Sequence, residues 1–360
     1  MKKKILFFLP SMFGGGAERV VLTILKDIDR QNFDPSLVLL KKEGRYLDDV
    51  PKDIKIIDLD VKQARYSLFK IYTLIKSEKP DIVFTSLAHL NLLIALIRPL
   101  FSKDIKFIAR ESNTVSQNNR VDKYPKINDF LYKRVYKNYD LIVTQAKAMR
   151  DDLRDNYGID NKRMKIIYNP VDFDTIIKRS KESDPRFDKD RYNLLAVGRL
   201  SYQKGFDMAI KIVKNLDDSY CLNILGDGDG RDELEELIRV NHLENRVKLL
   251  GFNDNPYAFM RDADLFILSS RYEGLPNVVL EANVLGLPVV AFNSSGGTAE
   301  IIDDGVNGFL VEAFDIDKFS KKIKEAREYN FDKEKISINC KKNFDSKRIV
   351  KEYERLFSNS

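Results

Sequence analysis

Hydrophobic positions along the chain form two kinds of segment that alternate. Short, almost continuous apolar runs are separated by longer segments in which apolar residues recur every three or four positions. The first pattern is typical of buried parallel strands and the second of the amphipathic helices that connect them. We therefore predict an α/β fold with two Rossmann-like, doubly wound parallel-sheet domains.

The expected elements divide into two sets. In the first half we expect strands at 4–9, 36–40, 54–59, 81–85, 105–109 and 141–144, and helices near 17–29, 66–78, 88–100, 125–138 and 146–156. In the second half we expect strands at 194–197, 222–225, 247–249, 265–268 and 288–292, and helices near 206–216, 231–241, 255–261, 277–285 and 298–302.

The length of 360 residues also favours two domains, because it exceeds the size at which one hydrophobic core usually keeps growing. We predict an N-terminal domain at 1–170, a charged linker at 171–190 and a C-terminal domain at 191–344. A last helix, near 345–357, carries its own apolar stripe of Ile349, Tyr353 and Phe357. That stripe must dock on another part of the protein.

The composition fits a globular protein in a reducing compartment. The only two cysteines, Cys221 and Cys340, lie far apart and have no metal-ligand spacing, so neither a disulfide framework nor a zinc site is predicted. The apolar run 5–9 is too short for a signal peptide, and no run reaches the roughly 18 to 20 apolar residues that span a bilayer. We expect a cytoplasmic protein.

Charge is distributed unevenly between the halves. Residues 1–180 hold 34 Lys and Arg against 23 Asp and Glu, a net charge of +11, whereas residues 181–360 hold 27 against 32, a net charge of −5. A basic half suggests an anionic surface or ligand on that side.

A glycine cluster, Gly14-Gly15-Gly16, follows the first expected strand and precedes a helix. Backbone N–H groups and the helix dipole make such a turn an anion site, although the glycines could simply permit a tight turn. A nicotinamide-binding fold is disfavoured. The spacing is not G-x-G-x-x-G, and the second strand ends in Leu40-Lys41-Lys42 rather than in an acidic residue for a ribose.

Two further strand ends in the second half carry candidate chemistry. Arg199 and Lys204 follow the strand at 194–197, at the end of the sheet where open parallel sheets bind ligands, and two cations there match a diphosphate. Asp227 and Asp229, in the loop 226–230, lack the bidentate Glu and the spacing of a calcium-binding loop. We interpret that loop as a turn.

Paired carboxylates follow the strand at 265–268. Glu273 comes just before an expected helix that begins near Pro276, and Glu281 comes about two turns later. A carboxylate at each place suits a polyhydroxy ligand. By spacing alone, a helix-terminal acid and a surface Glu explain the pair equally well.

These motifs, in this order, resemble glycosyltransferase family 4, whose fold is GT-B. The resemblance covers nearly the whole chain. It rests on the loop at 14–19, Gly198-Arg199-Leu200 with Lys204-Gly205, the loop at 226–228, and a motif in which seven residues separate Glu273 from Glu281. The resemblance implies a retaining hexosyltransferase that uses a nucleotide-sugar, usually a UDP-sugar, without a bound metal or other cofactor.

The resemblance also implies roles for individual residues. Arg199 and Lys204 would neutralise the diphosphate leaving group, Glu273 would orient the transferred sugar, and Glu281 would hold the ribose. The remaining donor-binding positions that it implies are Gly15, Gly16, Gly228, Gly251, Phe252, Gly274, Leu275, Pro276 and Asn277. The last helix would cross back to the N-terminal domain.

One position departs from the family pattern. Many members carry a histidine after the strand that matches 105–109, where this chain has Glu111. Glu111 could replace that histidine in orienting donor or acceptor, or it could be structural. His89, just past the preceding strand, is a second candidate for contact with the sugar or acceptor.

The basic residues of the first half suggest what kind of acceptor the protein uses. Cations alternate with aromatic residues in 120–137, as an interfacial segment needs for anionic lipid headgroups, although a core-facing aromatic stripe with a solvated basic face fits as well. We expect a saccharide acceptor, such as one linked to polyprenyl diphosphate, at the inner face of the plasma membrane. No nucleic-acid recognition motif accompanies the basic residues. An epimerase or phosphorylase of the same fold, or an idle binding protein, stays open.

Overall fold

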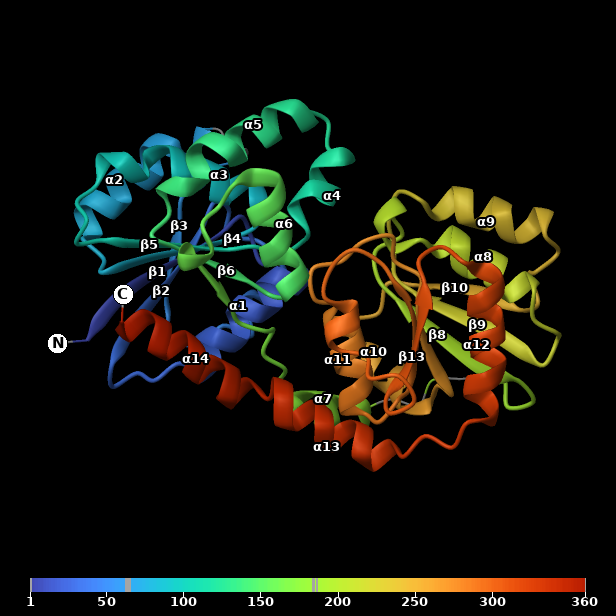
Figure 1. Cartoon of the computed structure of the whole chain (residues 1–360). Helices are drawn as coiled ribbons and strands as arrows, with labels where there is room; N and C mark the ends of the chain where they lie inside the picture. The colour runs from blue at the N-terminus through green and yellow to red at the C-terminus, as the bar shows by residue number, and fades with distance from the viewer. Residues whose placement is uncertain (1, 62–65, 183–184, 186, 360) are drawn as a thin grey trace. The chain divides into compact units, whose positions relative to one another are not determined.

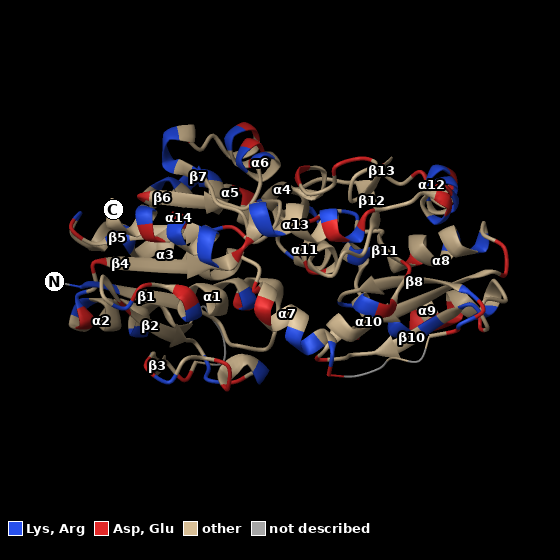
Figure 2. Cartoon of the chain, turned by 90° about the horizontal axis from the view of Figure 1, so that it is seen from below, with Lys and Arg blue, Asp and Glu red and all other residues tan. Residues whose placement is uncertain are grey.

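The computed structural model describes residues 2–61, 66–182, 185 and 187–359. The chain divides into two compact units (Figure 1). The first consists of Met1–Pro170 together with Ser346–Ser360, and the second is Val171–Asp345. Each unit is built on a parallel sheet, as the hydrophobic pattern predicts. Charged residues lie mainly on the helices and loops, and the strands contain few of them (Figure 2).

The first unit contains a seven-stranded parallel sheet in the order β3-β2-β1-β4-β5-β6-β7. Its strands are β1 (Lys3–Leu9), β2 (Phe33–Leu39), β3 (Lys55–Asp58), β4 (Ile82–Ser86), β5 (Lys106–Arg110), β6 (Leu141–Thr144) and β7 (Met164–Ile166). Its helices are α1 (Gly16–Asp27), α2 (Leu68–Glu78), α3 (Ala88–Ile97), α4 (Val115–Arg120), α5 (Pro125–Val135), α6 (Lys147–Tyr157) and α14 (Ser346–Ser358).

Both faces of the first sheet are buried, which explains why its strands are continuously apolar. Alternate residues of a strand point to opposite faces. Leu6 and Phe8 of β1 join one core with residues of α2, α3, α5 and α6. Phe7 joins the other core with residues of α1 and α14.

The last helix completes that second core. Ile349, Tyr353 and Phe357 of α14 are fully buried, and the ring of Phe357 lies 5.8 Å from the ring of Phe84 and 6.0 Å from that of Phe7. The stripe that the sequence shows at 345–357 therefore docks on the sheet of the first unit. Its apolar side chains replace solvent across β1 and β4.

The second unit contains a six-stranded parallel sheet in the order β10-β9-β8-β11-β12-β13. Its strands are β8 (Tyr192–Val197), β9 (Tyr220–Leu225), β10 (Val247–Gly251), β11 (Leu265–Leu268), β12 (Val289–Asn293) and β13 (Gly308–Glu312). Its helices are α7 (Phe173–Ser180), α8 (Phe206–Lys214), α9 (Arg231–Val240), α10 (Pro256–Asp262), α11 (Asn277–Val284), α12 (Ile316–Glu328) and α13 (Lys333–Phe344).

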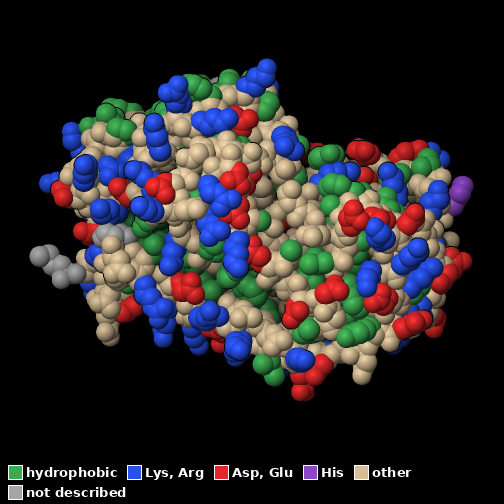
Figure 3. All heavy atoms as spheres, viewed as in Figure 1, with side chains coloured by type: hydrophobic (Ala, Val, Ile, Leu, Met, Phe, Trp, Pro, Cys, Tyr) green, Lys and Arg blue, Asp and Glu red, His purple; other side chains and the backbone are tan. Residues whose placement is uncertain are grey.

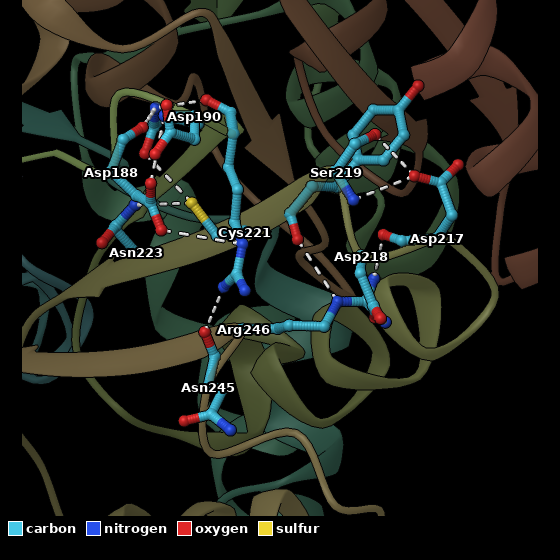
Figure 4. Close-up of polar contacts among 12 residues, drawn as sticks. Asp188, Asp190, Asp217, Asp218, Ser219, Cys221, Asn223, Asn245 and Arg246 are labelled. Carbon is cyan, nitrogen blue, oxygen red and sulfur yellow. Dashed lines mark hydrogen bonds and ion pairs between the residues drawn. The ribbon is translucent and has the colours of Figure 1, made fainter.

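A buried arginine anchors the edge of this sheet far from the strand ends that carry the candidate motifs. The Arg246 guanidinium donates to the carbonyl oxygens of Val213, Leu216, Asp217 and Tyr220 at 2.7–3.3 Å. Figure 4 shows Arg246 beside Asp217 and Asp218. The first three carbonyls lie at and just beyond the carboxyl end of α8, where a cation also interacts favourably with the helix dipole, and Tyr220 is the first residue of β9.

The structure differs from the expected elements in several places. The stretch 171–190, expected as a linker, contains α7, which packs on α10 within the second unit. The helix expected at 298–302 is a single 3-10 turn, Thr298–Glu300. Besides α7, five of the strands and α-helices in the described part of the chain had not been predicted: β7, β13, α4, α12 and α13. Among the described residues, no helix is both long and apolar enough to cross a membrane.

Candidate active site

The candidate site of the second unit lies where its strand order reverses. From β8 the sheet continues to β9 and β10 on one side and to β11, β12 and β13 on the other. The loops that follow β8 and β11 therefore leave neighbouring strands in diverging directions, and open parallel sheets bind ligands at such a point. The Arg199–Lys204 loop and the Glu273 loop are these two loops.

Backbone contacts fix the two loops against each other. The Ser269 hydroxyl donates to the carbonyl oxygen of Lys204 at 3.0 Å, and the Arg271 N–H donates to that of Gln203 at 2.8 Å. Gly205 has a φ of +64°, and a Cβ there would lie 2.2 Å from the carbonyl oxygen of Ser269. Only glycine permits this approach.

An ion pair joins the loops at the candidate chemistry. Lys204 Nζ lies 2.7 Å from Glu273 Oε1, and the Ser270 hydroxyl donates to the same oxygen at 2.6 Å. The Glu273 side chain is only 7% exposed and that of Lys204 is 20% exposed. Burial with two donors holds the carboxylate in one orientation, because an unpaired charge there would be costly. The two residues are 69 positions apart in the chain.

Arg199 differs from Lys204 in being exposed. Within the described part of the chain, no carboxylate forms an ion pair with its guanidinium. Arg199 is therefore available to an anionic ligand at the carboxyl end of β8. The site thus offers one cation ordered by a carboxylate and one that faces solvent.

The loop from Glu273 to Asn277 also forms hydrogen bonds with the loop that follows a third strand, β12. The Glu273 N–H donates to the carbonyl oxygen of Ser295 at 2.9 Å, and the Gly297 N–H donates to that of Gly274 at 2.6 Å. Gly296, with a φ of +125°, passes so close that a Cβ would lie 2.1 Å from the carbonyl oxygen of Glu273.

The helix that follows buries most of the motif. Leu275 and Pro276 are buried, Asn277 is half-buried and begins α11, and Glu281 is buried within that helix. Glu281 is therefore not the surface residue that spacing alone would allow. Burial of a carboxylate requires polar partners, which suits either a structural or a ligand-binding role.

The loop 226–230 forms a turn against the loop after β8. A Cβ on Gly226 would lie 1.8 Å from the carbonyl oxygen of Gly198, and one on Gly228 would lie 2.6 Å from that of Leu200 and 3.1 Å from Cγ of Arg199. Gly228 therefore lies directly beside Arg199. Asp227 accepts from the Gly228 N–H at 2.9 Å, as a turn residue does.

The strand end next to this turn carries the candidate nucleobase region. Gly251 ends β10 with a φ of +75°, and its carbonyl oxygen accepts from the Gly226 N–H at 2.8 Å. Phe252, the next residue, is exposed. The predicted donor-binding residues of the second unit thus lie on loops that leave neighbouring strands of one sheet edge, or on α11.

The glycine cluster of the first unit lies at the carboxyl end of β1. Gly15 caps α1, and Gly14 has a φ of +117°. Arg45 supports the turn, because its Nε donates to the carbonyl oxygen of Phe13 at 2.8 Å. The predicted strand, glycine turn and helix N-terminus are all present, and Gly16 is the first residue of α1.

Glu111 lies in the core of the first unit. It is 1% exposed, and its Oε1 accepts from Asn91 at 3.0 Å, from the Tyr132 hydroxyl at 3.2 Å and from the Tyr136 hydroxyl. Burial raises the pKa of this carboxyl to about 8, against the opposing effect of the hydrogen bonds from Asn91 and Tyr132. Of the two roles open to Glu111, the structural one fits, since the side chain is enclosed by protein groups.

His89 lies in the first turn of α3, just beyond the carboxyl end of β4, and is exposed. It is accessible to a ligand of the first unit, in contrast to Glu111. Contact of His89 with a sugar or acceptor stays a prediction.

Comparisons with known proteins identify the family. A model described as Glycosyltransferase Family 4 matches residues 14–175, and one described as Glycosyl transferases group 1 matches residues 177–343. A relative from Campylobacter jejuni, N-acetylgalactosamine-N,N'-diacetylbacillosaminyl-diphospho-undecaprenol 4-alpha-N-acetylgalactosaminyltransferase, is 30% identical over 321 residues, 86% of each chain. The chain belongs to glycosyltransferase family 4.

Other relatives agree with this assignment. The amylovoran biosynthesis glycosyltransferase AmsD of Erwinia amylovora is 28% identical over 305 residues, 83% of this chain and 82% of the relative. The crystal structure of Anabaena Alr3699/HepE in complex with UDP and glucose has a TM-score of 0.80 at 21% identity and covers 99% of this chain and 100% of its own. This family 4 glycosyltransferase therefore has the GT-B fold, as the resemblance implies.

Sequence reasoning missed several residues of this glycosyltransferase that shape the site. Ser270 lies in the segment whose two carboxylates, Glu273 and Glu281, were predicted to bind ligand. A serine next to a strand end is common, so the sequence alone does not indicate its contact with Glu273. Gly296 and Gly297 follow β12 as other glycines follow β8 and β9, so a search for glycines after every strand would have found them.

Proposed function

We propose that this glycosyltransferase moves a hexose or N-acetylhexosamine from a UDP-sugar to a saccharide acceptor carried on polyprenyl diphosphate, with retention of configuration and without a bound metal. The observation that carries the proposal is the ordered Lys204–Glu273 pair beside exposed Arg199 at the switch point of the second sheet. Cations there match the negative charge of a nucleoside diphosphate.

The charges that develop during sugar transfer explain the roles proposed for Arg199 and Lys204. Cleavage of the bond between the sugar C1 and the diphosphate oxygen leaves negative charge on the diphosphate and positive charge on the sugar ring. Fixed cations that meet this charge stabilise the transition state, because they need no reorganisation. Lys204 is pre-oriented by Glu273 and has donors to spare for a phosphate oxygen. Arg199 can bind the diphosphate through its planar fork.

Glu273 is proposed to orient the sugar rather than to attack it. Lys204 and Ser270 both donate to its Oε1, which lowers the nucleophilicity of the carboxylate and fixes its plane. In the proposed reaction the acceptor hydroxyl attacks from the face that the diphosphate leaves, and the departing phosphate takes its proton. A trapped glycosyl ester on Glu273 would contradict this role.

Two observations support the acceptor and the stereochemistry. The Campylobacter jejuni relative is named for an acceptor linked through diphosphate to undecaprenol and for an α-linked product. A UDP-sugar with an α-linked donor sugar gives an α product when configuration is retained. The relationship at 30% identity over 86% of both chains supports the same class of acceptor here.

The test is transfer of radiolabelled sugar from a panel of UDP-, GDP- and ADP-sugars to a short-chain polyprenyl-diphosphate saccharide. Lys204→Ala is expected to lower turnover by about 10² to 10³, the effect of losing one preorganised electrostatic group. Lys214→Ala, which removes an exposed lysine at the end of α8, is the matched control and should retain wild-type turnover.

The same assay separates the alternatives. Label in the lipid extract is expected for transfer. Sugar interconversion without an acceptor would indicate an epimerase, and tight donor binding without turnover would indicate a binding protein. EDTA is expected to leave the rate unchanged, because Arg199 and Lys204 are proposed to carry the charge that a metal would otherwise meet. Turnover of Lys204→Ala within about threefold of wild type, with the variant folded, would refute the assignment.

A further inference from the structure

Four apolar side chains of α5 and of the residues just before it are left uncovered by the first unit. Val121, Tyr124, Ile127 and Phe130 are each 52–59% exposed. They recur every three residues along the segment that leads into α5 and through the first half of the helix. Exposed apolar side chains that are grouped in this way often mark an interaction surface.

The inner face of α5 is committed to the core. Tyr132 of α5 and Tyr136, the residue just after the helix, are fully buried, and both hydroxyls donate to Glu111. Asp129 also turns inward, where it accepts from Asn119 at 2.9 Å and from the Tyr157 hydroxyl at 2.7 Å. The orientation of α5 is thus fixed, so the exposed row cannot rotate into the protein.

Cations surround the exposed row. Six Lys and Arg lie between positions 120 and 137, and all are exposed: Arg120, Lys123, Lys126, Lys133, Arg134 and Lys137. Only two acids occur there, and Asp129 is turned inward. Arg134 lies 5.6 Å from the ring centre of Phe130, and Lys123 lies 5.5 Å from that of Tyr124. Figure 3 shows hydrophobic and basic side chains intermixed along the edge of the first unit where α5 runs.

We propose that this α5 face is a docking surface for an anionic lipid bilayer, with Ile127 and Phe130 inserted between headgroups and the flanking cations bound to lipid phosphates. An apolar centre flanked by Lys and Arg is the pattern of helices that lie in a membrane interface. A protein partner fits less well, because lysine is depleted at protein interfaces. The inference rests on the proposed function in one respect only: docking on the bilayer would bring the enzyme to a lipid-linked acceptor.

The test is sedimentation of the full chain with phosphatidylcholine vesicles that contain or lack phosphatidylglycerol. Binding is expected only with phosphatidylglycerol and should weaken at high salt. Ile127→Ser/Phe130→Ser should weaken it at least about tenfold through lost apolar burial. Lys126→Glu/Lys133→Glu should weaken it at least about 25-fold, from roughly fivefold for each lost cation.

Matched controls lie in the second unit. Ile338→Ser removes an exposed apolar residue of α13, and Lys321→Glu/Lys324→Glu reverses two exposed lysines of α12. Both should sediment like wild type. Far-UV circular dichroism and UDP-sugar binding, which the α5 variants should retain, exclude unfolding as the cause.

Two outcomes would overturn the docking surface: unchanged sedimentation of the folded α5 variants, or no vesicle binding by the wild-type chain even at low salt. Failure of the proposed function is distinguishable from these, because it would appear as absent transfer to the short-chain acceptor whatever the vesicles show. If the function holds, the α5 variants should keep that soluble transfer and lose transfer to acceptor embedded in vesicles.

Discussion

The buried carboxyl group of Glu111 makes the stability of the first unit depend on pH. Its pKa is raised from an ordinary value of 4.5 to about 8, with burial as the main cause. Between these values the folded state keeps a proton that the unfolded state has lost. Stability is therefore highest below the unfolded pKa and falls as pH rises through this window.

The size of the effect follows from the shift. Each pKa unit corresponds to about 1.36 kcal/mol, so a shift from 4.5 to about 8 corresponds to up to about 4–5 kcal/mol of unfolding free energy lost by about pH 8. Glu111→Gln keeps a neutral side chain of the same shape at every pH. The variant should therefore gain stability relative to wild type as pH rises across the window, even though it changes a buried residue.

Chemical denaturation near pH 5 and near pH 8 measures this difference, with far-UV circular dichroism as the signal because the chain contains no Trp. Glu328→Gln, at an exposed position on α12, is the control and should show the same difference from wild type at both pH values. An equal Glu111→Gln effect at both pH values would mean that the native carboxyl is already ionised, and the reasoning would fail.

Two further changes test the scaffold of the site. Gly226→Ala should abolish donor binding and lower the melting temperature, because its Cβ would lie 1.8 Å from the carbonyl oxygen of Gly198. Gly158→Ala is the control: the space there is open, so this variant shows the cost of the backbone conformation alone. Donor binding by Gly226→Ala at the wild-type level would contradict the clash. Arg246→Met should cost about 3 kcal/mol of unfolding free energy by calorimetry, since four carbonyl oxygens each lose a hydrogen bond from the guanidinium. A loss no greater than that of exposed Arg239→Met would refute the anchor.

Much of the fold could be predicted from the sequence because both sheets are covered on both faces. Parallel strands of that kind are continuously apolar and stand out from the helices between them. The strands that were missed are less distinct. β7 has three residues, one of them the exposed Lys165, and β13 lies at the sheet edge, where Glu312 is exposed. α13 buries only Ile336, Cys340 and Phe344 in a highly charged segment.

The candidate site was predictable residue by residue but not as an arrangement. Glycines and cations after strands mark the ends of the sheet, and the family resemblance gives them roles. Nothing in the local sequence shows that Lys204 meets Glu273, because that contact depends on β8 and β11 being neighbours in the sheet. The burial of Glu111 was equally hidden, since its surroundings come from α3 and α5.

The return of α14 to the first unit sets an order of events during synthesis. Residues 171–345 form a continuous unit that can fold as soon as it leaves the ribosome. The first unit, although made earlier, must wait for residues 346–358, and until then Phe7 and Phe84 lack the cover of Phe357. The half that is translated first is therefore the half whose folding is completed last, and premature termination near residue 345 would leave that half, rather than the truncated end, prone to aggregation.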